Sequence, residues 1–283
     1  MANIINAIIN MINNPVEKIT STYLGKNKIN NVGDALEEYV KDLFADSFDL
    51  SDYDRNIKIS QTFSYLGNSS NPPDGMLFDG DAYEVKKISS PNSQLALNSS
   101  KPKQKLSVDC PLINNACKDA EGGTWREKDF IYIVGNIDSQ NNIRHLCMVY
   151  GDDYCANDET YNKIARSIKQ SVDNTIGFES QSTKELGRFN RVDPLGISYL
   201  RVRGMWGIEN PWQVFKYIFE RNANTEFDFM GIINEDKWLA LENTKELMDL
   251  SLKVRSLNIK DVMINNPDNP ALMKKAKLVT YYK

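Results

Sequence analysis

The chain of 283 residues contains one histidine, His145, and four cysteines without CxxC spacing. A Ser-His-Asp triad or a Cys-His pair would have to use His145, which lies in an apolar run typical of a strand. The cysteines match no spacing of a zinc site, although a site built from all four is the alternative: Cys110, Cys117, Cys147 and Cys155. Reduced thiols in a cytoplasmic protein are the expectation.

Long apolar runs and an excess of basic charge are also missing. No stretch of eighteen apolar residues occurs, so neither a transmembrane helix nor a membrane partner is expected. The apolar segment from Met1 to Ile9 lacks a basic start and contains Asn3 and Asn6, which favours a short core helix over a signal peptide. The net charge is −4. DNA binding depends on local basic patches, so this value neither supports nor excludes it.

The composition is that of a folded domain, with 41% hydrophobic and 25% charged residues. Helical spacing of apolar residues occurs at 34–48, 159–172, 212–219 and 246–252. Strands are predicted at 57–65, 75–78, 82–88, 130–136, 143–150, 197–203, 227–233 and 278–282, and loops at 20–33 and 68–74. Since no repeat or long linker occurs, we predict a single α/β domain over 1–283, with a semi-separate C-terminal half from about 175 as the alternative.

The segment most informative about chemistry is Pro73-Asp74, followed after nine residues by Glu84-Val85-Lys86. Alternate residues of a strand lie on one side, so Glu84 and Lys86 face together. The Asp79-Gly80 turn folds the preceding strand back and brings Asp74 close. Two converging carboxylates suit Mg²⁺, which polarises a scissile phosphate and lowers the pKa of a bound water. Lys86 would orient that water and offset developing charge.

This spacing is not specific by itself, because a surface hairpin with solvated charges shows it as well. Alternation with Tyr83 and Val85 indicates a half-buried strand, an acidic helix precedes it and a basic loop follows it. Glu37 in that helix is a further candidate carboxylate, unless it forms a solvated face with Glu38. The predicted catalytic residues are Asp74, Glu84, Lys86 and Glu37, and the predicted metal ligands are Asp74, Glu84 and Val85.

Two segments have the composition of a DNA-binding surface. Small polar side chains and lysines suit phosphate contacts, amides can read base edges, and arginine is the commonest reader of guanine. In the loop 90–105 the candidates are Asn92, Ser93, Gln94, Asn98, Ser99, Ser100, Lys101, Lys103 and Lys105. In the stretch 184–203 they are Arg188, Asn190, Arg191, Arg201 and Arg203. The alternatives are a flexible surface loop for the first segment and structural salt bridges with Glu185, Asp193 and Glu209 for the second.

Longer stretches of the sequence are similar to those of one known family. They are Gly33 to Phe44, Phe63 to Asn68, Asn71 to Asp74, Glu84 to Ile88, Leu97 to Ser100, Lys105 to Asp109, Asn190 to Pro194 and Tyr199 to Ile208. On these residues the chain resembles the NgoPII family of type II restriction endonucleases nearly from end to end. Such long runs are more specific than the catalytic motif.

The resemblance implies a PD-(D/E)xK nuclease, with an α/β fold whose mixed β-sheet is flanked by helices and carries the metal site on its central hairpin. It implies Mg²⁺-dependent cutting of double-stranded DNA at the palindrome GGCC, leaving 5′-phosphate and 3′-hydroxyl ends. A cognate DNA methyltransferase would be a functional rather than a physical partner. A palindromic site is matched most simply by a two-fold symmetric homodimer.

Two other functions stay open from the sequence. One is a repair or recombination nuclease of the same fold that recognises DNA structure. The other is a non-catalytic DNA-binding protein, against which the intact Asp74, Glu84 and Lys86 argue, since a dead site has no need for all three. A small-molecule enzyme is disfavoured because no nucleotide-binding glycine motif occurs.

Overall fold

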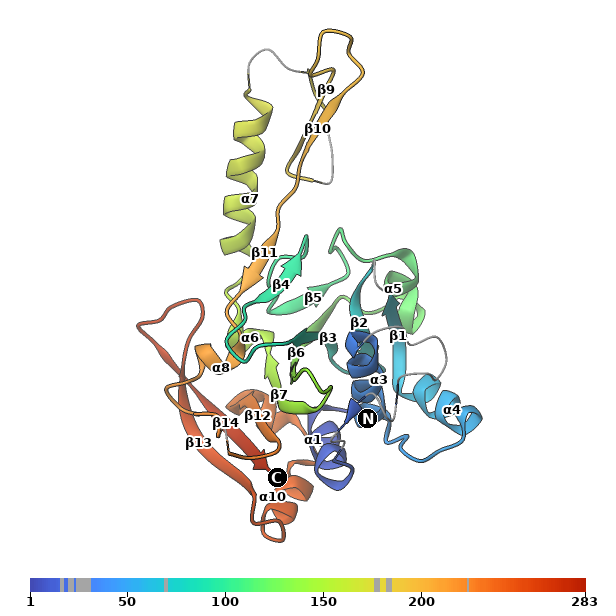
Figure 1. The fold of residues 1–283 in the computed structure, drawn as a ribbon, viewed down its shortest axis with the longest axis vertical. Helices are drawn as coiled ribbons and strands as arrows, with labels where there is room; N and C mark the ends of the chain where they lie inside the picture. The colour runs from blue at the N-terminus through green and yellow to red at the C-terminus, as the bar shows by residue number, and fades with distance from the viewer. Residues whose placement is uncertain are drawn as a thin grey trace.

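A large mixed sheet forms the centre of the molecule (Figure 1). The computed structural model describes residues 1–15, 18, 19, 23, 32–68, 71–175, 179–181, 185–222 and 224–283. In sheet order the strands are β1 (Phe63–Asn68), β2 (Asn71–Leu77), β3 (Ala82–Ile88), β6 (Glu127–Ile137), β7 (Ile143–Tyr150), β12 (Asp228–Asn234), β14 (Met273–Tyr282) and β13 (Leu257–Asn265). Strand β5 (Lys105–Ser107) pairs with β6 outside this path. The pairs β3–β6 and β7–β12 are parallel, and the other pairs are antiparallel.

Helices cover one face of the sheet around a continuous apolar core. The helices near this face are α1 (Ile4–Asn13), α3 (Val32–Ala45), α4 (Asp52–Thr62) and α10 (Thr244–Ser251). Helix α1 begins at the capping residue Asn3, and its buried apolar side chains hold it on the core. Helix α3 approaches β6 at Gly135, where an added Cβ would lie 2.7 Å from the Leu36 side chain. This close approach places the start of α3 at the end of the central strands.

The other face packs against short helices and the residues between them. These helices are α5 (Asn115–Asp119), η1 (Ala120–Gly123), α6 (Gly151–Tyr154) and α8 (Pro211–Val214), while α9 (Glu235–Ala240) follows β12. Trp212 and Phe215 are almost fully buried against Cys147 and Met230 in this second core. The sheet is thus a layer between two apolar cores, which is the usual way to bury both faces of a mixed sheet.

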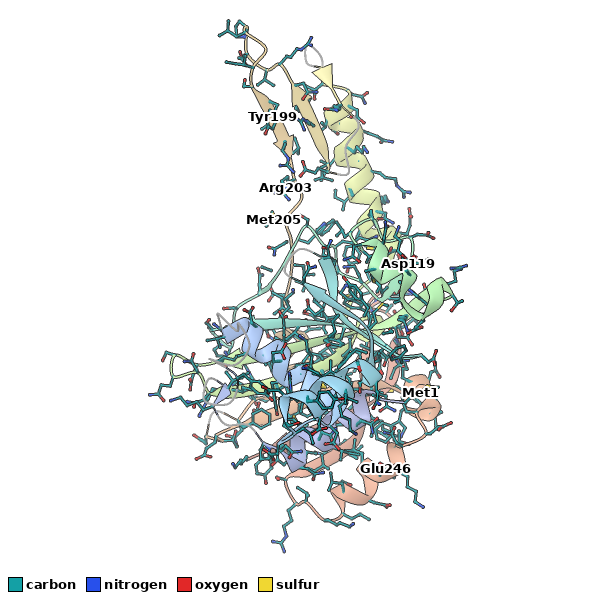
Figure 2. All side chains as sticks on the ribbon, turned by 90° about the vertical axis from the view of Figure 1, so that its right-hand side faces the viewer. Met1, Asp119, Tyr199, Arg203, Met205 and Glu246 are labelled. Carbon is teal, nitrogen blue, oxygen red and sulfur yellow. The ribbon has the colours of Figure 1, made fainter. Side chains whose placement is uncertain are left out.

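An arm projects from this body (Figure 1). It consists of α7 (Asp158–Asp173) and the small sheet of β8 (Glu179–Ser180), β9 (Gly187–Asn190) and β10 (Tyr199–Val202). Helix α7 buries none of its residues, and Figure 2 shows Tyr199, Arg203 and Met205 along the arm. The chain returns through β11 (Trp206–Ile208), which pairs with β4 (Leu95–Asn98) on the body.

Most predicted elements are confirmed, and three local predictions are wrong. Residues 57–62 form the end of α4 rather than a strand, because Ser51 caps a helix there and only Ile59 is buried. The predicted loop 68–74 includes the start of β2, which runs through a cis Pro72-Pro73 bond. The predicted helix 212–219 is helical only as far as Val214, and β13 was not predicted because its side chains are mostly exposed. Most of the predicted loop 20–33 lies outside the described residues.

The cysteines do not form a zinc site. All four are free thiols, of which Cys117, Cys147 and Cys155 are buried. Among the residues that the structure describes, no group of three or more His, Cys, Asp or Glu side chains is spaced to hold a metal ion. In the same residues no helix is long and apolar enough to cross a membrane.

Candidate active site

The candidate active site begins at the hairpin of β2 and β3, as the sequence predicts. Gly75 pairs with Tyr83 and Met76 with Ala82, so the preceding residue Asp74 comes opposite Glu84. Gly75 leaves no room for a side chain, since an added Cβ would clash with the Tyr83 ring. That ring stacks on Phe44 of α3 with centroids 5.2 Å apart, which fixes the hairpin on the helix.

Three of the predicted catalytic side chains meet on this hairpin. An oxygen of the Asp74 carboxylate, Oδ2, accepts a hydrogen bond from the backbone N–H of Val85 at 2.7 Å. The Lys86 ammonium donates to Glu84 Oε1 at 2.6 Å. The second oxygen, Glu84 Oε2, is buried without a hydrogen-bond partner among the described residues. The Asp74 carboxylate is thus fixed by a backbone hydrogen bond, whereas only one of the two Glu84 oxygens has a hydrogen-bond partner among the described residues.

A cleft of about 300 Å³ opens over these groups. Asp74, Glu84 and Lys86 form one side of it, and Glu37 reaches it from α3. The remaining wall includes Asn68, Asn71, Leu97, Asn98, Ser99, Ser100 and Leu112. The cleft therefore joins five segments that are separate in the sequence.

Burial and like charges shift the pKa values of these groups. Burial, with the Glu84 carboxylate beside it, raises the pKa of Asp74 to about 8 although Lys86 opposes the shift. Burial also raises the pKa of Glu37, against the lowering effect of Lys41. For Lys86 burial works in the other direction, but Glu84 and Asp74 outweigh it and raise the pKa of the ammonium. The carboxyl groups therefore resist carrying their negative charges together, while Lys86 is held protonated.

The donor set fits a magnesium ion. Mg²⁺ is usually bound by one or two protein carboxylates, with water and substrate phosphate completing its shell. Asp74 and Glu84 supply hard oxygen donors of this kind, including the buried Oε2 of Glu84 that has no partner in the described residues. Glu37 lines the same cleft, but no three His, Cys, Asp or Glu side chains of the described residues are spaced to hold a metal ion together. Val85 meets Asp74 through its N–H, and its predicted contact with a metal stays a prediction.

The two carboxylates at the start of α3 have different surroundings. Glu38 is paired with Lys41 at 2.5 Å and with Arg55 of α4 at 2.7 Å. It therefore joins two helices. Glu37 points into the cleft and lies close enough to Glu84 and Lys86 for their charges to affect its pKa. Of the pair, only Glu37 belongs to the candidate site.

Comparison with known proteins decides the family. The model of the NgoPII restriction endonuclease family matches residues 2–265. The type II restriction enzyme NgoPII of Neisseria gonorrhoeae is 58% identical over 280 residues, covering 99% of each chain. The chain belongs to the NgoPII restriction endonuclease family. It is accordingly a type II restriction enzyme, a site-specific endonuclease. No solved structure matches it.

The first predicted DNA-binding segment of this NgoPII-family chain is divided by the fold. Asn98, Ser99 and Ser100 line the cleft beside the candidate catalytic groups. Lys101 instead donates to Asp158 at 2.8 Å and to Asn162 at 2.7 Å, and so ties the body to the base of α7. Lys105 pairs with Glu127 at 3.0 Å on β6, away from the cleft.

Lys103 requires a correction, because the side chain is only 4% exposed. Its ammonium donates to the Ser100 hydroxyl and to the Lys101 carbonyl and lies 5.6 Å from the centre of the Phe130 ring. A buried lysine with these contacts stabilises the loop that contains Ser100 and Lys101, and it is not accessible to DNA.

The start of the same segment is anchored to α8. Asn92 Oδ1 accepts from Gln213 at 3.0 Å and from Arg221 at 3.3 Å. The carbonyl of Ser93 accepts from the buried Asn210 at 2.7 Å, and the Gln94 side chain donates to Glu209. Sequence reasoning did not single out Arg221 or Asn210, because neither belongs to a local basic cluster.

The arginines of the arm are partly engaged within the arm. Arg201 and Arg203 both bind the carboxylate of Glu185, with contacts of 2.5 and 2.9 Å, although 47% and 57% of their side chains stay exposed. Arg188 lies 4.4 Å from the centre of the Tyr199 ring and donates to Asn190, and Arg191 is exposed. The alternative that these arginines form structural salt bridges is thus confirmed for Glu185. Asp193 instead caps a turn through Ser198, and Glu209 binds Gln94.

One strand pair connects the two predicted DNA-binding segments. In the β4–β11 ladder Asn98 pairs with Trp206, three residues beyond Arg203. The wall of the candidate active-site cleft is therefore joined, through Asn98, to the strand at the root of the arm. Sequence patterns cannot reveal this connection, because the paired residues lie far apart in the chain.

Proposed function

We propose that this chain hydrolyses phosphodiester bonds of double-stranded DNA at the palindrome GGCC, using Mg²⁺ and leaving 5′-phosphate and 3′-hydroxyl ends. We assign it to the PD-(D/E)xK superfamily. The observation that carries the proposal is the meeting of Asp74, Glu84 and Lys86 in one cleft. The proposed site sequence follows the family resemblance, and the 58% identity to NgoPII supports it.

Asp74 and Glu84 would hold the metal ion. When bound, Mg²⁺ supplies Lewis-acid polarisation of the scissile phosphate and lowers the pKa of a water. The hydrogen bond from Val85 keeps the Asp74 carboxylate in one orientation. Glu84 Oε1 is paired with Lys86, whereas the buried Oε2 has no hydrogen-bond partner among the described residues.

Lys86 would act on the attacking water and on the developing charge. Its pKa is raised, so the ammonium stays protonated over the working pH range. Such a group donates hydrogen bonds to water or to phosphate oxygens but does not remove a proton. We assign Lys86 to orientation of the water and to charge stabilisation, and Glu37 to a second position on the water network.

The DNA would lie across the cleft and along the arm. Asn98, Ser99 and Ser100 line the cleft and would contact the DNA beside the scissile phosphate. Further contacts would come from the guanidinium groups of the arm, which belong to Arg188, Arg191, Arg201 and Arg203. A GC-only site suits arginine, which binds guanine O6 and N7 in the major groove. A palindrome suits a homodimer, in which each subunit cuts one strand. The cognate methyltransferase would protect the host DNA in the same cytoplasm.

The test is digestion of a plasmid of known sequence with and without Mg²⁺, followed by mapping of the ends. Mg²⁺-dependent fragments ending within GGCC are expected. Discrete fragments at another sequence would keep the nuclease and reject the proposed site. Cutting at branched or damaged DNA alone would favour a repair nuclease. DNA binding without cutting under any divalent metal would favour the non-catalytic alternative.

A further inference from the structure

A second cleft, of about 420 Å³, lies at β7 and α8. Its wall includes Asn92, His145, Trp212, Gln213, Lys216 and Arg221. Asn92 comes four residues after the end of β3. This cleft contains none of the residues of the candidate active site.

The register of the sheet places the second cleft on the same face as the catalytic groups. Glu84, Lys86 and Ile88 alternate along one face of β3. Ile88 pairs with Asn136 on β6, and Asn136 pairs with His145 on β7. Neighbouring strands lie about 4.8 Å apart, so His145 is roughly 10 Å across the sheet from β3.

Two buried donors at this cleft have no partner among the residues that the structure describes. They are Nη1 of Arg221 and the indole Nε1 of Trp212, a residue that is only 3% exposed. The Arg221 guanidinium lies 5.3 Å from the centre of the Trp212 ring, and its Nη2 donates to Asn92. Buried polar groups are normally hydrogen-bonded, so two unsatisfied donors side by side indicate a site that accepts a ligand.

The charges around these donors favour an anion. Burial lowers the pKa of Arg221, with Asp228 opposing the shift. The carboxylate of Asp228 is already bonded to His145 at 2.5 Å and to the Asn222 N–H at 3.1 Å. Lys216 adds a second cation at the rim, and Glu220 is the one acidic residue of the lining. A ligand with several acceptor oxygens would satisfy both donors and the desolvated charge.

The cleft is held in place relative to the catalytic strand. Asn210, which is fully buried, donates to the carbonyls of Pro91 and Ser93 and caps α8 through Gln213. The segment after β3 is thus fastened to the helix that carries Trp212. A group bound here would be positioned accurately against Lys86.

We propose that this second cleft binds a phosphate group, and that the phosphate belongs to the DNA backbone next to the bond that is cut. The second half rests on the proposed nuclease function. Arginine binds phosphate oxygens through paired N–H donors, and the indole N–H adds a neutral donor. Arg221 and Trp212 would then position the DNA strand across the active site.

Fluorescence anisotropy of a labelled GGCC duplex, in buffer with Ca²⁺ in place of Mg²⁺, tests the proposal. Arg221→Gln should weaken DNA binding about tenfold. The slope of the logarithm of the binding constant against the logarithm of the salt concentration should become shallower by about one, because one counterion fewer is released. Arg255→Gln removes the same charge from an exposed position outside the cleft, and should leave the affinity and salt slope of the wild type. Trp212→Phe keeps the ring and removes the N–H, and should weaken binding with little change in salt slope.

A second measurement separates the sources of phosphate and does not depend on cutting. Thermal unfolding without DNA is followed as inorganic phosphate is added, for the wild type and for both cleft variants. If DNA binding is unaffected by Arg221→Gln but phosphate stabilises only the wild type, the site takes free phosphate and the DNA assignment is overturned. If neither measurement separates Arg221→Gln from Arg255→Gln, the phosphate site itself is rejected. A wild type that binds no DNA would instead reject the proposed function.

Discussion

At the scale of single residues, Asp74 and Glu84 are neighbouring carboxylates, and the Lys86 ammonium is bonded to Glu84. Burial and mutual repulsion raise the pKa of Asp74 to about 8, and Glu84 Oε2 has no partner in the described residues. Such a cluster gains from any cation that it can bind. This electrostatic imbalance is the physical argument for metal binding at the hairpin.

Asp74→Ala should reduce DNA cleavage by roughly a thousandfold while binding of the duplex in Ca²⁺ buffer is retained. The substitution removes a metal ligand, but it also removes a negative charge near the DNA phosphates. Cleavage is measured on a plasmid and binding by gel retardation. Asp249→Ala, at an exposed position of α10, serves as the control and should cut normally. Loss of binding together with cleavage would contradict the assigned role.

The raised pKa of Asp74 predicts how metal-free stability depends on pH. The folded value of about 8 lies above the unfolded value of about 3.9, so the native state holds a proton that the unfolded state releases. Stability from this group is complete below about pH 4 and is lost as the pH rises towards 8.

Asp74→Asn does not titrate, so in EDTA it should unfold at a higher temperature than the wild type near pH 8, and the difference should shrink near pH 5. Added Mg²⁺ should reverse the order, because the ion stabilises only the chain that binds it. Thermal denaturation with and without Mg²⁺ makes the comparison. A difference that is independent of pH would show that Asp74 has an ordinary pKa.

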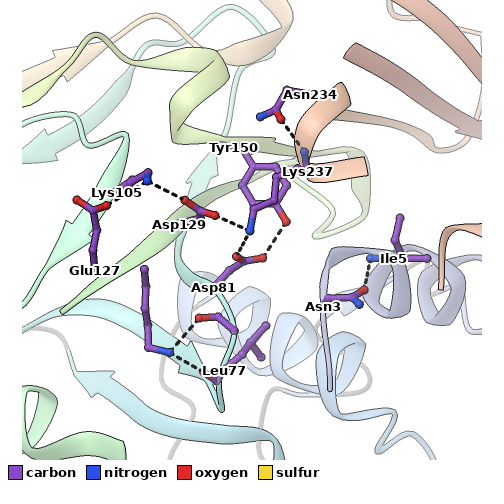
Figure 3. A network of polar contacts seen from close by, with 12 residues as sticks. Asn3, Ile5, Leu77, Asp81, Lys105, Glu127, Asp129, Tyr150, Asn234 and Lys237 are labelled. Carbon is purple, nitrogen blue, oxygen red and sulfur yellow. Dashed lines mark hydrogen bonds and ion pairs between the residues drawn. The ribbon is translucent and has the colours of Figure 1, made fainter. Parts of the chain in front are cut away.

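At the scale of elements, a charged network joins the turn of the β2–β3 hairpin to α9 (Figure 3). Lys237 of α9 binds Asp81 at 3.0 Å and Asp129 at 2.5 Å, and the Tyr150 hydroxyl donates to Asp81 at 2.8 Å. Asp81 is almost fully buried, so its charge depends on these partners. The network therefore fixes the end of the hairpin that lies away from the active site.

Lys237→Met should lower the free energy of unfolding by about 3 kcal/mol, because Asp81 loses its cation while it stays buried. Equilibrium denaturation in urea gives the value. Lys275→Met removes an ammonium that is 68% exposed and 3.5 Å from Glu235, and should cost less than about 0.5 kcal/mol. Equal effects of the two substitutions would show that the buried network contributes no more than a surface pair.

At the scale of the whole molecule, the arm projects from the body beyond the β4–β11 ladder (Figure 1). Asn98 of that ladder lines the candidate active-site cleft. Each chain has one candidate active site, whereas cutting a palindrome requires two. We therefore expect two copies of the chain on one GGCC duplex. Sedimentation velocity of the protein with a short duplex in Ca²⁺ buffer measures this ratio. A complex with one copy per duplex would refute the homodimer and require sequential cutting.

The sequence by itself determined the elements whose signals are local. Strand β7 has the predicted bounds, α7 differs by one residue at each end, and the turn at Asp79-Gly80 folds the hairpin as expected. The sequence predicts the proximity of Asp74, Glu84 and Lys86, because strand alternation and one tight turn are enough to place the three side chains near one another. The family was also recognisable, because long runs of residues carry it.

Only the tertiary structure decided which polar side chains are available. Lys101 and Lys103 lie in the same polar, basic segment, so the sequence does not distinguish them. In the structure Lys103 is buried, whereas Lys101 binds Asp158 of α7. The second cleft joins Asn92, His145 and Arg221 from three distant segments, and no spacing predicts that meeting. Local patterns encode the hydrogen bonds and exposure of one element. The partners of a side chain depend on how distant elements pack, and this packing is a property of the whole chain.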